Sequence, residues 1–390
     1  MPKVNEQSGA YSYSILLNDL SLPVLLTPGQ IGIIITENIR QKLPSGKFVI
    51  FDHEQLYKGN NPINDGTKLK IAIGDGNSNT ISYGNFVAFG TPHRVMHSSG
   101  TPALLVPFIL DNHNYLSQTV NQSFTGASSS VISQIASKLN MPYYTNDSTN
   151  DSMTWRPSTK SWSKFVKFIS DHSWTDSKSV FFHGVDSSNT LYFVNIQKLF
   201  ENRKPKMIFV RGYDQSKDTK SQLPYFNILD YYAASRSGQF NSEGAYNSRT
   251  TQTNGDGSVS IYNQVSASKN ANTQLDINKK VAYGMQNRGK IRIAPFDCGN
   301  GHANYINALH QNERLRLTYS QNLYILVQGH TGVSLFDIVI VKVYSNGDIR
   351  QTVSNIYAVT AKSKLIHGAI YYEKIELTTM GISNQNAELY

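Results

Sequence analysis

The hydrophobic pattern changes its period near the end of the chain, within residues 302–343. Positions at three- and four-residue spacing predict a short helix with one face formed by Tyr305, Ala308, Leu309 and Asn312. Residues 315–320 then alternate between apolar and polar, which predicts a half-buried strand. Two runs that are apolar on both faces, 323–329 and 336–343, follow, and a polar break from Gly329 to Ser334, which holds two glycines, lies between them.

Short runs with strand spacing also fill the first 121 residues. They lie at 11–17, 31–35, 47–51, 69–73, 83–89 and 104–110. Asn18-Asp19 and Asp75-Gly76 provide turn signals between them, and Asp-Gly readily adopts the positive φ angles of a tight hairpin. Several short strands separated by turns predict a small antiparallel barrel or sandwich.

Residues 122–205 show helical spacing instead. Ser128 to Ser130 are predicted to cap a helix whose apolar face is Val131, Ile132, Ile135, Ala136 and Leu139. Trp155-Arg156-Pro157-Ser158 introduces a second helix, with the face Trp162, Phe165, Val166, Ile169 and Trp174. Residues 180–184 and 191–194 predict a hairpin across Asp186 to Asn189.

Strand signals return after residue 205. Residues 206–211 and 225–232 predict two strands. The stretch 235–274 is rich in Ser, Asn, Gln, Thr and Gly, so it is predicted to be an inserted excursion with little core and an edge strand at 258–262. Asn346-Gly347 is the strongest hairpin signal in the chain, and 356–360 and 369–377 supply the last strands.

Two of these patterns resemble one family. The order of helix, strand ending in Gly329-His330-Thr331 and hydrophobic run resembles the last barrel of the central hub proteins of phage baseplates. That family includes the late control protein of simple contractile tails and the hub part of type VI secretion spikes. The order of helix, loop, Trp155-Arg156-Pro157, helix, His172-Ser173-Trp174 and hairpin resembles the domain between the two barrels of the same family.

The resemblance implies an α+β, mainly β fold, with two tube-like antiparallel β-barrel domains and an intervening α/β region. The implied boundaries are 1–121 for the first barrel, 122–205 plus 237–312 for the middle region, 206–236 plus 313–380 for the second barrel, and 381–390 for a C-terminal tail. The interleaving of these segments comes from the resemblance alone.

The function implied by the resemblance is that of a structural hub. Three copies, each with two barrels, would form a pseudo-sixfold ring around the DNA or effector channel and would join the tail tube to the central spike. The implied partners are two further copies of the chain, the tail tube protein, the central spike or tail-tip protein and the tape measure protein. The polar segment 381–390 is predicted to reach the spike. The expected location is the virion tail baseplate, assembled in the host cytoplasm, with no enzyme activity.

Composition agrees with a β-rich globular protein. The 390 residues include 23 tyrosines, 17 phenylalanines and a single cysteine, Cys298, which excludes an internal disulfide framework. The sequence shows no signal-peptide pattern and no apolar run of the roughly 20 residues needed to span a bilayer. The formal net charge of +9 is concentrated in 203–220 and 279–292. It indicates a nucleic-acid surface, a protein interface or a solvated face, and the absence of a nucleic-acid motif favours the last two.

The candidate chemical motifs are all incomplete. His93 and His97 have metal-ligand spacing without a Glu between them, and they follow Pro92 in a predicted loop or strand. Cys298 and His302, with His310, lack a fourth zinc ligand, and the Cys-His pair lacks a known nucleophile environment. Residues 254–258 resemble a calcium loop, but Val265 stands where the loop needs Glu. The sequence therefore predicts no catalytic site, no metal and no cofactor.

Two other functions remain open from the sequence. A receptor- or carbohydrate-binding tail protein would also be rich in β-structure and tyrosine, but it would need exposed tryptophans, and Trp155, Trp162 and Trp174 group around a helix that is predicted to be buried. A hub that carries cell-wall hydrolase activity would need paired acids or a Cys-His motif.

Overall fold

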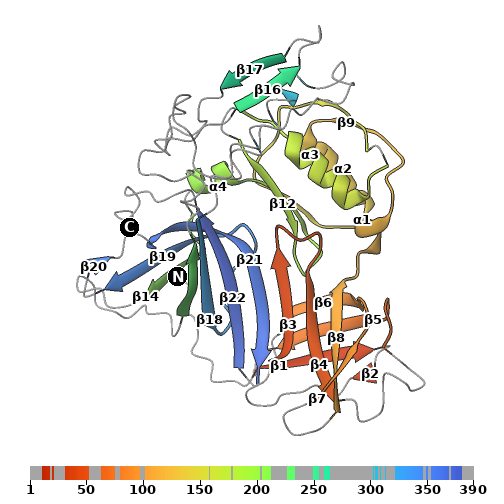
Figure 1. Cartoon of the computed structure of the whole chain (residues 1–390), viewed down its shortest axis with the longest axis vertical. Helices are drawn as coiled ribbons and strands as arrows, with labels where there is room; N and C mark the ends of the chain where they lie inside the picture. Colours follow the sequence, from red (N-terminus) through yellow and green to blue (C-terminus); the bar gives the residue numbers. More distant parts are fainter. Residues whose placement is uncertain are drawn as a thin grey trace.

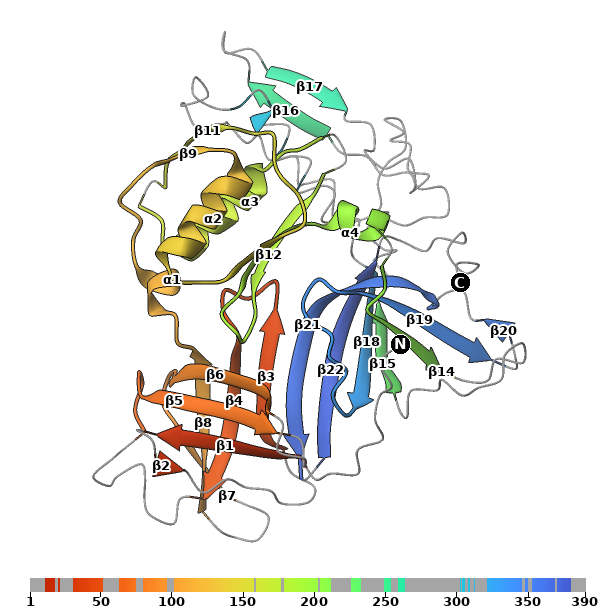
Figure 2. The same ribbon diagram turned by 180° about the vertical axis from the view of Figure 1, so that it is seen from behind.

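The computed structural model describes most of the chain. The described residues are 11–17, 20–21, 31–51, 63–74, 80–96, 102–157, 159–176, 179–202, 204–211, 226–232, 249–253, 259–263, 302, 304–305, 308, 312, 321–345, 348–349, 353–368 and 370–379. Figure 1 shows two groups of strands below a helical region, and Figure 2 shows the same arrangement from behind.

Six strands form what we call the first module. They are β1 (Ser12–Leu17), β3 (Ile31–Asn38), β4 (Ser45–Phe51), β5 (Lys68–Gly74), β6 (Thr80–Ala88) and β8 (Pro102–Leu110). Two short strands extend it, since β2 (Leu20–Ser21) pairs with β1 and β7 (His93–Met96) pairs with β8. All six predicted runs are strands here. Leu69, Ile71 and Ile73 of β5 are buried on one face, as their alternation predicts.

Six more strands form the second module. They are β14 (Met207–Arg211), β15 (Phe226–Tyr232), β18 (Gln321–Gln328), β19 (Ile338–Ser345), β21 (Asn355–His367) and β22 (Ile370–Thr379). The short strand β20 (Asp348–Ile349) pairs with the end of β19 on the other side of the predicted Asn346-Gly347 turn. The pair β16 (Arg249–Thr253) and β17 (Val259–Asn263) forms a separate ribbon within the stretch predicted to be an excursion.

The two modules have the same strand order. The first runs β3-β4-β8-β6-β5-β1, and the second runs β15-β18-β22-β21-β19-β14. If the six strands of each module are numbered along the chain, both orders read 2-3-6-5-4-1. The pairs 2-3, 3-6, 6-5 and 5-4 are antiparallel in both modules. The pair 4-1 differs, because β1 is antiparallel to β5 whereas β14 is parallel to β19.

The predicted mainly β fold is confirmed, and the helices α1 to α4 lie between β8 and β14 along the chain. Among the described strands, the pairings within each module form an open path and not a closed ring. One further pairing joins the modules, because β3 of the first lies antiparallel to β21 of the second. Eleven strands from β15 to β2 therefore form one continuous hydrogen-bonded path.

The intervening region contains both predicted helices and the predicted hairpin. It holds the helices α2 (Ser128–Lys138), α3 (Trp162–His172) and α4 (Ile196–Asn202), and the short helix α1 (His113–Ser117) leads into it from β8. Strand β12 (Phe181–Val185) pairs with β13 (Leu191–Asn195), which is parallel to β10 (Tyr143–Thr145), and β9 (Phe124–Gly126) pairs with β11 (Met153–Trp155). Both predicted helix faces are buried apart from Leu139 and Trp174, which are half-buried.

The N-terminus of α2 is capped differently from the prediction. The N-cap position is Ala127, which has no side-chain acceptor, and Ser128 is the first helical residue. The backbone N–H of Ser128 donates to Asp151 Oδ1 (2.8 Å), and that of Ser129 donates to Thr149 Oγ1 (3.0 Å). The polar loop after β10 thus satisfies two of the free N–H groups, and its carboxylate lies at the positive end of the helix dipole.

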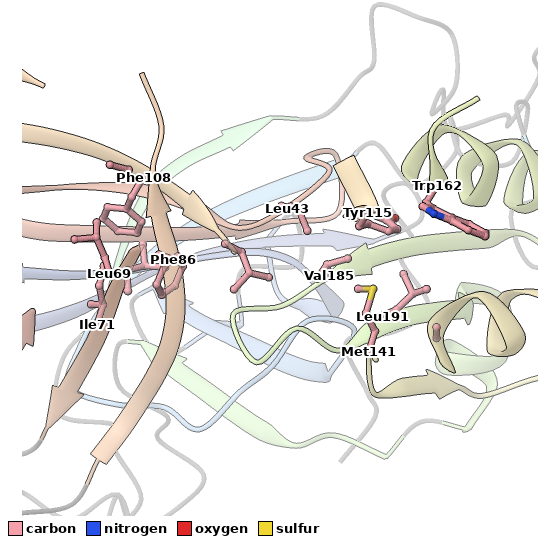
Figure 3. Close-up of a cluster of buried hydrophobic side chains, with 14 of the residues drawn as sticks. Leu43, Leu69, Ile71, Phe86, Phe108, Tyr115, Met141, Trp162, Val185 and Leu191 are labelled. Atoms are coloured by element: carbon pink, nitrogen blue, oxygen red, sulfur yellow. The ribbon is translucent and has the colours of Figure 1, made fainter. Parts of the chain in front are cut away.

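One hydrophobic core runs from the first module into the intervening region. In Figure 3 the first-module side chains Leu69, Ile71, Phe86 and Phe108 lie on one side, and Tyr115, Met141, Trp162 and Leu191 lie on the other. Leu43 and Val185 connect the two groups. The second module has a core of its own around Leu323, Ile325, Val341 and Tyr357.

Several predicted features lie outside the described residues. They are the turns at 18–19 and 75–76, the strand at 315–320, the tail at 381–390, and most of both basic segments. Among the described helices, none has the length and apolar character that a membrane span needs.

Candidate functional site: a buried joint between the two modules

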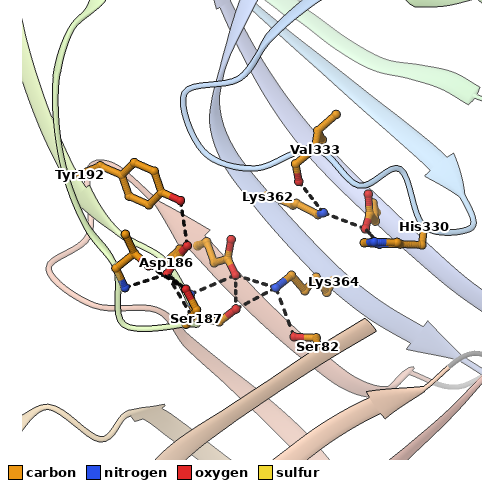
Figure 4. A network of polar contacts seen from close by, with 12 residues as sticks. Ser82, Asp186, Ser187, Tyr192, His330, Val333, Lys362 and Lys364 are labelled. Atoms are coloured by element: carbon orange, nitrogen blue, oxygen red, sulfur yellow. Dashed lines mark hydrogen bonds and ion pairs between the residues drawn. The ribbon is translucent and has the colours of Figure 1, made fainter. Parts of the chain in front are cut away.

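Three segments far apart in the sequence meet where the modules join. Strand β3 of the first module pairs with β21 of the second from Ala361↔Asn38 to His367↔Ile31. The turn between β12 and β13 reaches the same place from the intervening region (Figure 4). The backbone pairing is accompanied by charged side chains that are almost completely buried.

Glu37 and Lys364 form the centre of the joint. Glu37 of β3 is 3% exposed, and its Oε1 accepts from Lys364 Nζ of β21 at 2.7 Å. Lys364 Nζ also donates to Ser187 Oγ (2.8 Å) and to Ser82 Oγ of β6 (3.2 Å). The backbone N–H of Ser187 donates to Glu37 Oε1 (3.2 Å), and its hydroxyl donates to the same atom. One ion pair therefore links both modules and the turn.

The charge on Glu37 depends on these partners. Burial alone raises the pKa of a carboxyl group, because a charge is poorly solvated in the interior. The positive charge of Lys364 and the hydrogen bonds from Lys364 and Ser187, with a smaller contribution from Lys362, outweigh burial and hold the pKa of Glu37 below its usual value of 4.5. Glu37 is therefore ionised at neutral pH, and removing Lys364 would leave that charge buried without its cation.

A second buried carboxylate, Glu373 of β22, organises the adjacent loop. Lys362 Nζ lies 2.9 Å from its Oε1, and His330 Nδ1 and the Tyr371 hydroxyl both lie 2.9 Å from the same atom. The backbone N–H of Thr331 donates to Oε2 at 3.1 Å. Burial raises the pKa of Glu373, but the opposite effect of Lys362 and His330 is larger, and the net pKa is about 2. The loop that follows β18 is thereby fixed to β22.

The turn between β12 and β13 is held rigid by one carboxylate. Asp186 Oδ1 accepts from the backbone N–H groups of Ser188 (3.0 Å) and Thr190 (2.9 Å), and Oδ2 accepts from the Tyr192 hydroxyl (3.0 Å). The turn approaches β6 closely at Gly84, where a Cβ atom would lie 3.1 Å from the Ser187 carbonyl oxygen. A glycine at this position gives the turn room to reach Glu37.

The segment predicted as a helix near residue 305 contacts the intervening region. Asn312 is fully buried, its Oδ1 accepts from the backbone N–H of Phe181 (3.0 Å), and its Nδ2 donates to the Ser173 carbonyl (2.9 Å). His302 Nε2 donates to the His172 carbonyl (3.0 Å), while its Nδ1 accepts from Asn304 (3.2 Å). This arrangement is that of a neutral imidazole, and burial lowers the pKa of His302 accordingly.

The residues weighed as metal ligands are not brought together where the structure describes them. His93 lies in β7, and His302 contacts the end of α3 and belongs to a different region. His97, Cys298, His310 and 254–258 lie outside the described residues. Within the described part of the chain, no group of three His, Cys, Asp or Glu side chains has the geometry to hold a metal ion. The absence of catalytic, cofactor and metal sites stays a prediction.

Sequence reasoning missed the joint. Lys362 and Lys364 stand two apart in a strand that is otherwise mostly apolar, and this alternation signals charges on one face. Their partners, however, are set by the pairing of β21 with β3 and β22. No local pattern specifies a contact between residues 327 positions apart.

Removing one partner of the Glu37–Lys364 pair is predicted to destabilise the protein strongly, whereas replacing both partners is predicted to cost much less. Lys364→Met should lower the free energy of unfolding by about 3 to 5 kcal/mol, because it leaves Glu37 charged and buried. The double variant Glu37→Leu, Lys364→Met should lose much less than the sum of the single losses. Chemical denaturation of the four proteins measures this.

The matched control for that cycle is Lys167→Met. Lys167 pairs with Asp171 one turn away on α3 but is largely exposed, so its loss should cost about 0.5 kcal/mol or less. Additive effects of the Glu37 and Lys364 substitutions would contradict a coupled buried pair.

His172 is predicted to make stability depend on pH. Burial, with contributions from Lys160 and His302, lowers the pKa of His172 from 6.5 to about 4 and outweighs the Phe168 carbonyl and Asp171, which raise it. Because the unfolded chain then binds a proton at a higher pH than the folded one, stability is complete above pH 6.5 and falls as the pH drops towards 4. The loss is up to about 3 kcal/mol.

The measurement is the free energy of unfolding between pH 7 and 4 for the natural protein and for His172→Phe, which keeps a ring stacked on Tyr305. The decline should be smaller in the variant. His113→Phe, which replaces an exposed histidine, is the control. Equal slopes in the natural protein and His172→Phe would overturn the prediction.

Comparison with known proteins finds the same fold in two tail proteins. No protein-family model and no curated protein sequence matches the chain. The tail protein from Neisseria meningitidis MC58 is similar in structure, with a TM-score of 0.54 at 10% identity over 95% of this chain and 97% of that one. The 43 kDa tail protein of prophage MuSo2 from Shewanella oneidensis gives a TM-score of 0.55 at 10% identity over 94% and 98%. The chain thus has the fold of these tail proteins along nearly its whole length, which confirms the resemblance at the level of the fold.

Proposed function

We propose that this chain is a structural hub of a phage tail or baseplate. The observation that carries the proposal is the presence of two modules with one strand order, joined edge to edge in a single chain. The fold shared with two tail proteins, one of them from a prophage, supports the same assignment. In this role the protein is a component of the virion tail.

The arrangement is suited to a change of symmetry. A chain with two similar modules can present six modules in three copies, so that one side of the ring meets a sixfold tube and the other meets a threefold spike. The proposed assembly is therefore a trimer with pseudo-sixfold symmetry around a channel. Its proposed partners are the tail tube protein, the central spike or tail-tip protein and the tape measure protein.

The proposed domain division follows the contacts. β14, β15 and the strands from β18 onward form one module, whereas Asn312 and His302 bind to α3 and β12. These contacts support a second barrel built from 206–236 and 313–380, and a middle region built from 122–205 and 237–312.

A structural role is favoured over the two alternatives. Trp155 and Trp162 are 0% and 3% exposed, so neither can stack on a sugar in a surface groove. The buried carboxylates Glu37 and Glu373 are each ion-paired with a lysine within the protein core. Neither observation fits a carbohydrate-binding groove or a pair of hydrolytic acids.

The trimer is tested by the mass of the purified protein in solution. Native mass spectrometry or light scattering at high concentration should give three times the chain mass of 43.6 kDa, and electron micrographs should show rings with six lobes. A monomer that persists at the highest soluble concentration, without rings, would contradict the trimer.

A further inference from the structure

The joint between the modules uses one particular pair of strands. β3 is strand two of the first module, and it lies against β21, which is strand five of the second. β22 occupies one edge of β21 over Ala358–His367, and β19 pairs with the other edge at Asn355–Ala358. β3 therefore lies on the edge that β19 leaves open.

The equivalent pair with the modules exchanged would be strand five of the first module and strand two of the second. Strand five of the first module is divided into β6, which pairs with β5 along Thr80–Val87, and β7, which pairs with β8. Strand two of the second module is β15, which pairs with β18. Among the described strands, β7 and β15 each have one partner, so each leaves one backbone edge open.

We propose that β15 of one copy pairs antiparallel with β7 of the next copy, repeating between chains the joint that β3 and β21 make within the chain. This deepens the trimer of the proposed function by naming the strands that meet. One such contact per copy, made head to tail, forms a ring when the rotation closes. An edge strand with unpaired N–H and C=O groups is a template for this kind of pairing.

The shared strand order gives the register on the β7 side. In the second module, Ala358 is the last residue of β21 that pairs with β19, and it lies opposite Thr378 of β22. In the first module, Val87 is the last residue of β6 that pairs with β5, and it lies opposite Ile109 of β8. Thr378 and Ile109 are thus equivalent. Four residues earlier on the same strands, Lys374 pairs with Ser363, and Leu105 pairs with His93. His93 is therefore the equivalent of Ser363.

The β15 side follows from the same reference point. In the second module, Thr378 pairs with Asn322 of β18, and Asn322 pairs with Tyr232 of β15. In the first module, Ile109 pairs with Ser45 of β4, and Ser45 pairs with Thr36 of β3. Tyr232 is therefore the equivalent of Thr36. Because Thr36 lies opposite Ser363 in the joint within the chain, Tyr232 lies opposite His93 in the joint between chains. Arg94 then faces Tyr231, and Val95 faces Asp230.

The surface around β7 agrees with a covered role in the assembly. His93 and Arg94 are exposed in the single chain. Phe89, in the link between β6 and β7, is 59% exposed. Large exposed aromatic side chains beside an open edge are typical of a surface that a protein partner covers.

A pair of cysteines tests the register. Cys298, the only cysteine, is first replaced by serine. His93→Cys with Tyr232→Cys should then form disulfides between chains under mild oxidation, because directly opposed residues have Cβ atoms at about the distance a disulfide needs. Dimers and trimers should appear on non-reducing gels in at least about tenfold greater yield than with His93→Cys and Asp230→Cys, a pair displaced along β15.

The chain contains its own positive control. Thr36→Cys with Ser363→Cys occupies the equivalent positions within one chain, where Thr36 Oγ1 and Ser363 Oγ are 3.0 Å apart, and it should oxidise without forming multimers. A mixture of the His93→Cys and Tyr232→Cys single variants should give dimers only. If a substitution disturbs folding, Arg94→Cys with Tyr231→Cys tests the next rung.

The outcomes separate this inference from the proposed function. A trimer by mass in which neither interchain pair cross-links, while the control pair oxidises, would overturn the β15–β7 contact and leave the trimer standing. A monomer that gives no cross-link would contradict both. Cross-linked multimers from the matched pair, with little from the displaced pair, would support the contact.

Discussion

The pairing of β3 with β21 is the contact on which the architecture depends. It converts two strand sets into one path and brings Glu37 against Lys364. A buried carboxylate stays ionised only when cations and hydrogen-bond donors compensate for lost solvation. Here the compensation comes from the second module and from Ser187 of the intervening region. The charge is therefore compensated only when both modules and the intervening region are in place. The ion pair thus specifies their arrangement as well as stabilising it.

The repeated strand order gives this joint its functional meaning. Two modules with the order 2-3-6-5-4-1 present the same types of edge, yet only one of the two possible joints is made within the chain. The modules also differ, since strand one is antiparallel to strand four in the first and parallel to it in the second, and strand five is interrupted in the first. Such differences suit the proposed role, in which the two modules are nearly equivalent on the side that meets a sixfold partner and differ on the side that meets a threefold partner.

Much of the fold could be predicted from the sequence because burial imposes a period. The alternation at Leu69, Ile71 and Ile73 and the helix face from Trp162 to Ile169 both specified their elements. The joint could not be predicted, since Lys364 carries no local mark of its pairing with Glu37. The cap of α2 was misplaced for a similar reason, because the acceptor, Asp151, comes from a loop 23 residues away. Local pattern determines which face is buried, whereas long-range pairing determines which charges meet.

Amide hydrogen exchange across the joint tests this account most directly. If the β3–β21 pairing unites the modules, the β21 amides between Ala361 and Ile366 that hydrogen-bond to β3, and not those that hydrogen-bond to β22, should exchange as slowly as the amides of the second-module core around Ile325 and Leu377. Exchange of these amides as fast as that of unbonded amides in exposed loops, with both module cores still protected, would mean that the modules open independently. That result would contradict the central claim that the buried joint holds them as one unit.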